Sequence, residues 1–199
     1  MGLFDIFKNK KKLQDEKPQI IFEGPSIFYH EDDFRQVEIV PGDNLLTLTK
    51  ESEEVDTFSK KNYTGSGFND IYVRNDDNKI ELNQRQINPN DLEKILSLLE
   101  YDRIPNVLTG YGQTHRELHK DCIAFAKNYN VIYYDFKENV VQHIWLTNHW
   151  GMDRVKLAKC LNDLGQQWGL LLQDWNLTVT IDLCNKESID NYLATYDNE

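Results

Sequence analysis

The sequence IPNVLTGYGQTHRELHKDCIAFAKNYNVIYYDFKENVVQHIWLT, residues 104–147, carries the densest structural signals in the chain. Its first part favours a helix. Thr114 followed by Glu117 is typical of a capping box, in which each side chain satisfies a free amide of the first turn. Apolar side chains then recur at the spacing of one helix face, at Leu118, Cys122, Phe125, Ala126 and Tyr129. We therefore predict a helix that begins at Thr114 and ends near Asn128.

The segments on either side of this predicted helix favour strands. Residues 107–108 lead into a glycine-rich turn at 110–112, which needs positive φ or a close backbone approach. Residues 131–136 and 140–147 are rich in β-branched and aromatic side chains, and a polar turn at 137–139 separates them. The stretch thus predicts a strand, a helix and a β-hairpin in succession.

The first half of the chain is mostly typical of short antiparallel strands. We predict them at residues 19–22, 26–29, 36–40, 44–49, 70–74 and 79–82. Clusters of Pro, Gly, Asn and Asp separate several of these strands and are typical of hairpin turns. Residues 50–68 are polar and contain glycine, so they predict a long loop with a short helical turn near residues 53–58.

The second half alternates helices with hairpins. Pro89 begins a helix that Asn88 or Asn90 caps, and residues 153–168 form another helix that ends at Gly169. The buried stripe of the earlier helix is Leu92, Ile95, Leu96 and Leu99. The remaining predicted elements are a hairpin made by residues 170–173 and 177–183, and a last helix after Asn185.

Together these elements predict an α+β fold, with an antiparallel β-meander in the first half and helices interleaved with β-hairpins in the second half. The chain has 199 residues, of which 40% are hydrophobic and 12% aromatic, enough to build a core. We expect residues 1–17 to be a flexible basic leader and residues 18–199 to form a single α+β domain. A sub-boundary near residues 86–89 stays open.

The charge of the chain excludes one large class of partners. The formal net charge is -11 at pH 7, and the leader, with five lysines against three acidic residues, is the basic exception. Nucleic-acid binding needs Lys and Arg at the phosphates, so we expect no nucleic-acid partner. Cys122, Cys160 and Cys184 have no metal-ligand spacing and cannot all pair. Cys122 and Cys160 lie within predicted helical patterns, so we expect them to be buried, reduced thiols of a cytoplasmic protein.

The leader is also compatible with binding to a membrane surface. No apolar run approaches the ~20 residues of a membrane span. Leu3, Phe4, Ile6 and Phe7 could instead enter a bilayer surface while the lysines at 8–12 meet anionic lipid. That would make the protein a peripheral membrane adaptor through residues 1–12. The simpler interpretation is a passive tail.

The predicted strand–turn–helix also holds the residues that could bind a small ligand: Gly110, Tyr111, Gly112, Thr114, His115 and His119. The two histidines are four residues apart, as in helical metal sites, but no third ligand follows, so we expect no metal and no cofactor. The glycines resemble half of a phosphate loop, yet His115 stands where a third glycine is needed. A plain tight turn is the simpler interpretation.

Acidic residues beside aromatic ones form the other candidate site. The candidate partner-binding residues are Glu31, Asp32, Asp33, Glu51, Glu53, Glu54, Asp56, Phe58, Tyr63 and Asp70. Protein interfaces favour aromatic anchors surrounded by charges that steer the partner, so this set predicts a basic protein partner. Solvated turns would give the same pattern.

These observations favour a non-enzymatic, protein-binding function. No serine lies in a G-x-S-x-G motif, no zinc-deaminase motif occurs, and we assign no catalytic residue. In size, acidity and class the chain is similar to the immunity proteins that neutralise bacterial toxins, although no particular motif carries the similarity. A small-ligand-binding protein or enzyme with a pocket at Gly110–His119 is the alternative.

Overall fold

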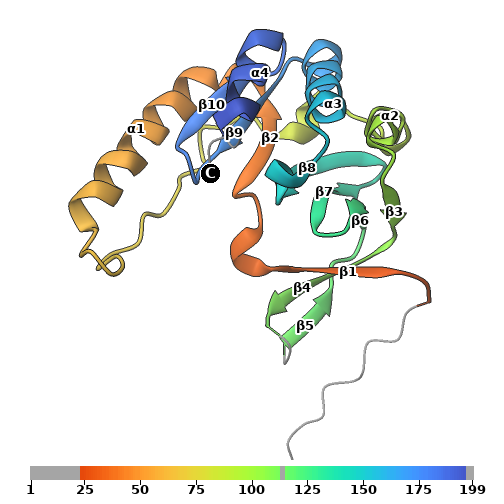
Figure 1. The fold of residues 1–199 in the computed structure, drawn as a ribbon, viewed down its shortest axis with the longest axis horizontal. Coiled ribbons are helices and arrows are strands. Elements are labelled where there is room, and N and C mark those ends of the chain that lie inside the picture. Colours follow the sequence, from red (N-terminus) through yellow and green to blue (C-terminus); the bar gives the residue numbers. More distant parts are fainter. Residues whose placement is uncertain (1–22, 113–114, 196–199) are drawn as a thin grey trace, which may run out of the picture.

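The computed structural model describes residues 23–112 and 115–195, and within them the chain forms two β-sheets and four α-helices (Figure 1). The large sheet contains β2 (Val37–Pro41), β3 (Asp102–Ile104), β6 (Cys122–Lys127), β7 (Asn130–Lys137), β8 (Val140–Thr147), β9 (Leu170–Asp174) and β10 (Val179–Asp182). The small sheet contains β1 (Ser26–His30), β4 (Asn106–Tyr111) and β5 (His115–Leu118). The α-helices are α1 (Leu45–Asn62), α2 (Pro89–Leu96), α3 (Arg154–Trp168) and α4 (Lys186–Ala194). Short 3-10 helices are η1 (Glu31–Asp33), η2 (Gly42–Asn44), η3 (Leu82–Arg85), η4 (Ser97–Leu99) and η5 (His149–Gly151).

Strand pairing confirms the predicted α+β class. The large sheet has the order β10-β9-β2-β8-β7-β6-β3, and every neighbouring pair in it is antiparallel. In the small sheet β4 lies in the middle, parallel to β1 and antiparallel to β5. The first two strands therefore belong to different sheets and do not form a meander.

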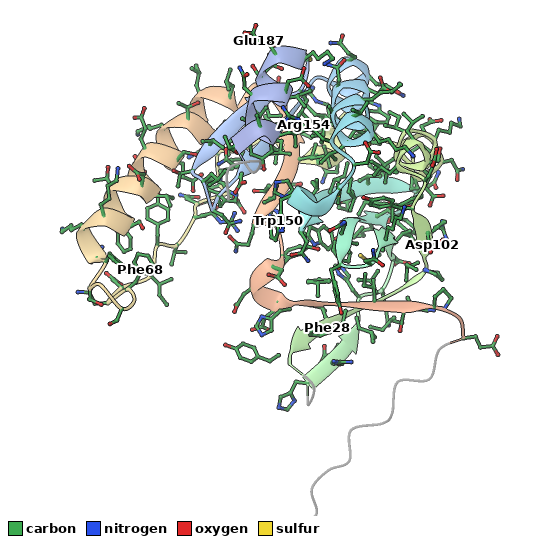
Figure 2. All side chains as sticks on the ribbon, viewed as in Figure 1. Phe28, Phe68, Asp102, Trp150, Arg154 and Glu187 are labelled. Carbon is green, nitrogen blue, oxygen red and sulfur yellow. The ribbon has the colours of Figure 1, made fainter. Side chains whose placement is uncertain are left out.

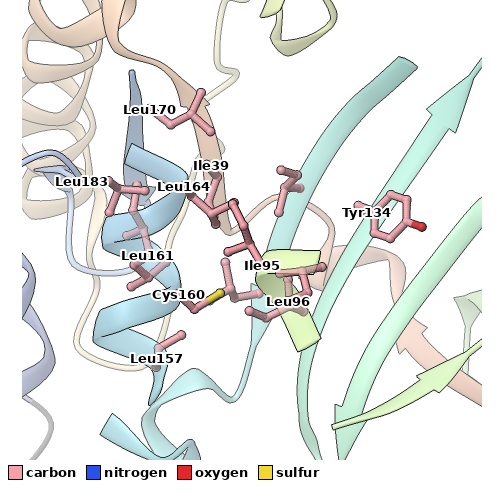
Figure 3. Close-up of a cluster of buried hydrophobic side chains, with 14 of the residues drawn as sticks. Ile39, Ile95, Leu96, Tyr134, Leu157, Cys160, Leu161, Leu164, Leu170 and Leu183 are labelled. Atoms are coloured by element: carbon pink, nitrogen blue, oxygen red, sulfur yellow. The ribbon is translucent and has the colours of Figure 1, made fainter. Parts of the chain in front are cut away.

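Each face of the large sheet has its own cover. Helices α2, α3 and α4 bury the main core against one face, and Figure 3 shows α3 leucines beside Ile39 of β2 and Ile95 of α2. On the opposite face, β1 and β4 of the small sheet pack over β6, β7 and β8 around Tyr133 and Trp145. Helix α1 covers the other end of that face through Leu48. The small sheet and α1 thus cover different parts of the same face.

Capping residues explain why α2 begins, and why α3 begins and ends, close to where the sequence predicts. The Asn88 side chain accepts a hydrogen bond from the Asn90 amide, and Pro89 occupies the first turn of α2. The Asp153 side chain accepts from two amides of the first turn of α3, and Gly169 ends that helix at φ 63°. Both predicted helices are confirmed.

Two hairpins and the last helix are confirmed as well. Strands β7 and β8 join through Glu138 and Asn139, which have φ of 51° and 63°. Two successive left-handed residues match the right-handed twist of the strands, as in a type I′ turn. Strands β9 and β10 form the second hairpin, and Asn185 caps α4 through the amide of Ser188.

The helix predicted from Thr114 to Asn128 is wrong, because the chain forms β5 and β6 there. Strand β6 is buried on both faces: Ile123 and Phe125 enter the main core, while Cys122 and its alternating neighbours face the small sheet. A strand that is apolar on both faces has no two-residue period, so its apolar run matched helical spacing by coincidence. Cys122 accordingly lies on a strand.

In the first half, β1 and β2 confirm the strands predicted at 26–29 and 36–40. The strand predicted at 44–49 and most of the loop predicted at 50–68 are wrong, because α1 occupies them. Only Leu48, Glu51 and Ser52 of this helix are buried, so it lacks a long apolar stripe. Its stability depends on contacts with distant residues, which local patterns do not show.

The strands predicted at residues 70–74 and 79–82 do not form. Residues 70–75 have no regular secondary structure, and η3 begins at Leu82. Exposed and half-buried side chains still alternate along residues 71–75, although no neighbouring strand pairs with them.

The predicted leader and the strand predicted at 19–22 lie outside the described residues, which also leaves the anchor at residues 1–12 without a structural description. Within residues 23–112 and 115–195, no helix combines the length and the apolar character needed to cross a bilayer.

Candidate functional site

The first candidate region is the α1 arm, which we define as residues 45–75. The later part of α1 extends away from the sheets, and the following segment returns beside it (Figure 1). The Phe58 and Tyr72 rings lie 5.5 Å apart, and the Tyr72 hydroxyl donates to Glu54 Oε2 at 3.2 Å. Near the tip, the Asn69 amide donates to the carbonyl of Asn62 at 3.1 Å. These contacts hold the returning segment against the helix.

A buried ion pair and a partly exposed one fix the base of this arm. The Glu51 carboxylate lies 2.6 Å from Lys79 Nζ and accepts a hydrogen bond from the Asn75 amide at 3.1 Å. Lys79 also pairs with Asp76 at 2.8 Å. Burial acts to raise the pKa of Asp76, but the hydrogen bond and charge of Lys79 outweigh it and lower that pKa. Lys79 further lies 5.2 Å from the centre of the Trp175 ring.

The tip of the α1 arm and the segment that returns from it expose several apolar side chains. Ile71 and Val73 are each 83% exposed, and Tyr63 and Phe68 near the tip are more than half exposed. Figure 2 shows Phe68 at the tip. No hydrogen bond joins the backbone of residues 72–74 to any other described residue. Exposed β-branched side chains on an unpaired, extended backbone are a template for pairing with another chain.

The structure divides the predicted partner-binding residues between two places. Glu51 is buried, so it is a structural residue of the arm's base. Glu54 pairs loosely with Lys50 at 3.6 Å, and Asp56 pairs with Lys60 at 2.6 Å. The other members on the arm are Glu53, Phe58, Tyr63 and Asp70, whereas Glu31, Asp32 and Asp33 form η1 beside the small sheet. The acidic clusters therefore do not make one continuous face.

The second candidate region is the small-sheet pocket, a cavity of about 390 Å³ between η1 and the β4–β5 hairpin. Its lining residues are Tyr29, Glu31, Phe34, Thr109, Gly110, Tyr111, His115 and Glu117. Strand register explains this set, because Thr109 pairs with Glu117 and Tyr111 pairs with His115. Side chains of paired residues, and of residues two apart, lie on the same face of a sheet.

A partly buried chain of polar side chains runs behind this pocket. The Tyr29 hydroxyl lies 2.9 Å from His119 Nδ1, and His119 Nε2 lies 3.4 Å from Asp135 Oδ2. Asp135 Oδ1 in turn lies 2.9 Å from His143 Nδ1. Burial raises the pKa of Tyr29 to about 12, so the phenol stays protonated and can donate to His119. The neutral tautomer that fits both contacts carries its proton on Nε2, toward Asp135.

Asp135 is the charged centre of this chain. Burial acts to raise its pKa, but hydrogen bonds from His119 and His143 outweigh that effect and lower the pKa to about 2. The His143 backbone amide also donates to Asp135 Oδ1 at 2.9 Å. An ionised Asp135 therefore pins the β7–β8 hairpin to the residues behind the small sheet.

Of the predicted ligand-binding residues, Gly110, Tyr111 and His115 line the small-sheet pocket. His119 lies behind the pocket wall, Gly112 follows β4, and Thr114 is outside the described residues. No group of three side chains suited to a metal ion occurs among the described residues. Gly110 has φ of 139°, and a Cβ there would overlap the carbonyl oxygen of His115. The glycine signal thus marks a close backbone approach between β4 and β5.

Sequence reasoning missed Tyr29, Phe34, Asp135 and His143. The predicted hairpin contained a usable signal, since its strands bring residues 135 and 143 near each other. A register shift between Asp135 and Phe136 makes Asp135 the partner of His143. Tyr29 gave no local signal, because it meets His119 from 90 positions away.

A third cavity, of about 250 Å³, opens beside the base of the α1 arm. Strands β2 and β8 pair only at two positions, and Val40 and His143 beyond the paired region both line the cavity. Arg35 and Lys79 lie on its wall together with Glu38, but all three already have ion-pair partners. This cavity belongs to the buried charge network and shows no preference for a ligand class.

Comparisons of the chain with models of protein families, with curated proteins and with solved structures found no match.

Proposed function

We propose that the protein is a binding module that holds a basic protein partner on the α1 arm. The observation that carries this proposal is the backbone of residues 72–74, which forms no hydrogen bond with another described residue and lies in a segment whose exposure alternates from one residue to the next. An extended segment of a partner can add to such a backbone as a strand, so that main-chain hydrogen bonds supply affinity and alternate side chains supply specificity. On this proposal, Ile71 and Val73 contact the partner while Tyr72 and Arg74 stay on the helix side.

Charge supports a basic partner. The net charge of -11 favours encounter with a positively charged protein, and Glu54, which is exposed on α1, accepts a hydrogen bond from the Tyr72 hydroxyl of the proposed docking segment, residues 70–75. Neutralisation of a bacterial toxin by an immunity-type protein is one biological setting that fits this proposal, in the cytoplasm. In that setting the module would cover a basic site of its partner without chemistry of its own.

Site-specific photo-crosslinking in the full chain tests the docking site and identifies the partner. A photoreactive residue replaces Val73 in one protein and Val155 in the other, within cells that normally express the chain. Val155 is the matched control because it is also β-branched and 79% exposed, but lies on α3. We expect a basic protein to crosslink at position 73 and not at position 155.

Affinity measurements with that purified partner complete the test. Val73→Asp should weaken binding by about tenfold or more, as expected for a central apolar contact, whereas Val155→Asp should leave it unchanged. Equal crosslinking at both positions, or equal affinity of the two variants, would show that the α1 arm is not the docking site.

A further inference from the structure

No strand among the described residues pairs with the docking segment, so side-chain contacts must hold it in place. Its side chains alternate in exposure, since Ile71 and Val73 are each 83% exposed, whereas Tyr72 and Arg74 are half-buried. The Tyr72 ring lies 5.5 Å from that of Phe58 on α1. Tyr72 and Arg74 therefore attach the segment to the protein on both sides of Val73.

The attachment at Arg74 reaches the large sheet. The Arg74 guanidinium carbon lies 4.8 Å from the centre of the Trp175 ring, which follows β9 and is only 7% exposed. Arg74 Nη1 also donates a hydrogen bond to the backbone carbonyl of Arg35 at 3.2 Å and lies 3.6 Å from Glu38 Oε1. A planar guanidinium can stack on a ring and form bonds at its edge at the same time, which a lysine ammonium cannot do.

The groups that receive Arg74 are held by contacts of their own. Glu38 is 3% exposed, and its Oε1 accepts a hydrogen bond from Trp175 Nε1 at 2.9 Å. The same carboxylate pairs with Arg35 Nε. Arg35 has φ of 57°, a backbone region that few residues other than glycine adopt. The guanidinium of Arg74 therefore meets a preformed ring, carboxylate and carbonyl.

We propose that Arg74 is a positioning residue, whose contacts with Trp175 and Glu38 keep the docking segment extended for a partner strand. This inference rests on the proposed function and deepens it. Without these contacts, residues 72–74 would sample many conformations, and only the extended fraction could pair with the partner. The apparent affinity falls in proportion to that fraction, through slower association. Dissociation changes little, because the paired strand holds the segment in the complex.

Positioning and charge predict opposite effects of the same substitution. Arg74→Gln makes the net charge of -11 one unit more negative, so steering alone would speed association with a basic partner. The positioning role predicts association slower by about fivefold or more, with dissociation changed by less than about twofold. Arg74→Lys keeps the charge but loses the planar stacking, so it should not restore the rate.

A second arginine provides the matched control for these rates. Arg103 pairs with Glu93 at 2.9 Å, as Arg74 contacts a glutamate, but it lies on β3, away from the α1 arm. Arg103→Gln removes the same charge and should not slow association. Stopped-flow rates with the partner crosslinked at Val73 compare the two variants with the wild-type full chain.

NMR relaxation of the free full chain tests the positioning role without any partner. Wild-type residues 71–73 should have backbone order parameters of about 0.85, and Arg74→Gln should lower them below about 0.6. The order parameters of α1 and β7 should not change. Arg74→Gln alters a partly exposed side chain and leaves the bond between Trp175 and Glu38 in place, so we expect the variant to fold. A merely structural role would lower the unfolding free energy without changing order at 71–73.

The outcomes separate the positioning role from the docking site. The proposal predicts that Val73→Asp weakens binding, and that Arg74→Gln slows association and lowers the order parameters at 71–73. If Val73→Asp weakens binding while Arg74→Gln changes neither quantity, the docking site stands and the positioning role is overturned. Faster association of Arg74→Gln overturns it as well, because Arg74 would then act only through its charge. If Val73→Asp leaves binding unchanged, the docking function fails, and the positioning role fails with it.

Discussion

The α1 arm and the small-sheet pocket have similar composition and opposite construction. Both combine acidic with aromatic residues on the same side of the large sheet. On the arm, Asp56 is paired with Lys60, and the exposed groups include apolar side chains beside a backbone that is unpaired at residues 72–74. In the pocket, packed rings form a fixed wall, and no cationic side chain among the described residues lines it. Composition alone therefore does not distinguish these two kinds of construction.

The two regions also differ in what keeps them in place. Ion pairs around Glu51 and Lys79 hold the arm at its base, whereas the pocket rests on ring packing and on the Tyr29–His119–Asp135 chain. Substitutions in the ion pairs of the arm and in the polar chain behind the pocket should therefore change stability for different physical reasons. The largest change is expected at the base of the arm.

The largest effect is expected at the base of the arm. Glu51→Lys would place two cations, the new lysine and Lys79, together in a buried site, and breaking a buried pair typically costs about 3–5 kcal/mol. Glu53→Lys, two residues away on the exposed side, should stay within about 0.5 kcal/mol. Urea unfolding of both variants measures the difference. Equal unfolding free energies would show that the ion pair does not hold the arm.

A glycine pair compares the rigidity of the two regions. Gly110→Ala would bring a Cβ onto the carbonyl oxygen of His115 at positive φ, and we expect a loss of roughly 2–4 kcal/mol together with loss of the pocket. Gly67→Ala at the tip of the arm has open space around its Cβ and should change stability by less than about 0.5 kcal/mol. Thermal and urea unfolding test both. A neutral Gly110→Ala would mean that the hairpin relaxes freely.

Acid should remove the support behind the pocket. The pKa of Asp135 is lowered from 3.8 to about 2 in the folded protein, so its ionised form favours folding. This contribution, on the order of 2 kcal/mol, is complete above the unfolded pKa and is lost as the pH falls toward 2. Asp135→Asn should therefore lower stability at pH 7 and flatten the pH dependence between about pH 4 and 2. An unchanged slope in that range would contradict the role of Asp135.

The smallest effect on stability is expected for exposed charges, although partner binding should respond. The double variant Glu53→Lys/Asp56→Lys should slow association with the partner crosslinked at Val73 by about tenfold at low salt, and the difference should shrink as salt rises. Asp163→Lys/Glu187→Lys is the control, because Asp163 pairs with Lys159 at 2.6 Å just as Asp56 pairs with Lys60. Stopped-flow association rates decide, and equal rates would show that these acids only keep the protein soluble.

The parts of the fold that follow from local chemistry were predictable. Asn88, Asp153 and Gly169 predict where α2 and α3 begin and end, and Lys137-Glu138-Asn139 predicts the β7–β8 turn. Strand β6 was not predictable from periodicity, because burial on both faces removes the strand period. Helix α1 was missed for the opposite reason, since few of its residues are buried and distant contacts stabilise it.

Some residues of the candidate sites were likewise visible in the sequence, and others depend on the tertiary structure. Gly110 and Gly112 lie at the hairpin that lines the pocket, whereas Tyr29 and Phe34 reach the pocket from a distant part of the sequence. The acidic residues of the arm were visible in the sequence, yet whether each is exposed, paired or buried depends on the tertiary structure. Glu51 illustrates this, because its charge serves Lys79 inside the protein.

Hydrogen exchange at the backbone of the α1 arm tests the central claim most directly. In the free full chain, the amides of residues 72–74 should exchange close to the rate of an unstructured peptide, while amides in β7 should exchange at least about 10³-fold more slowly. Addition of the partner crosslinked at Val73 should slow exchange at 72–74 by tenfold or more, as new main-chain hydrogen bonds form. Protection of these amides in the free protein, or no change on binding, would contradict the account.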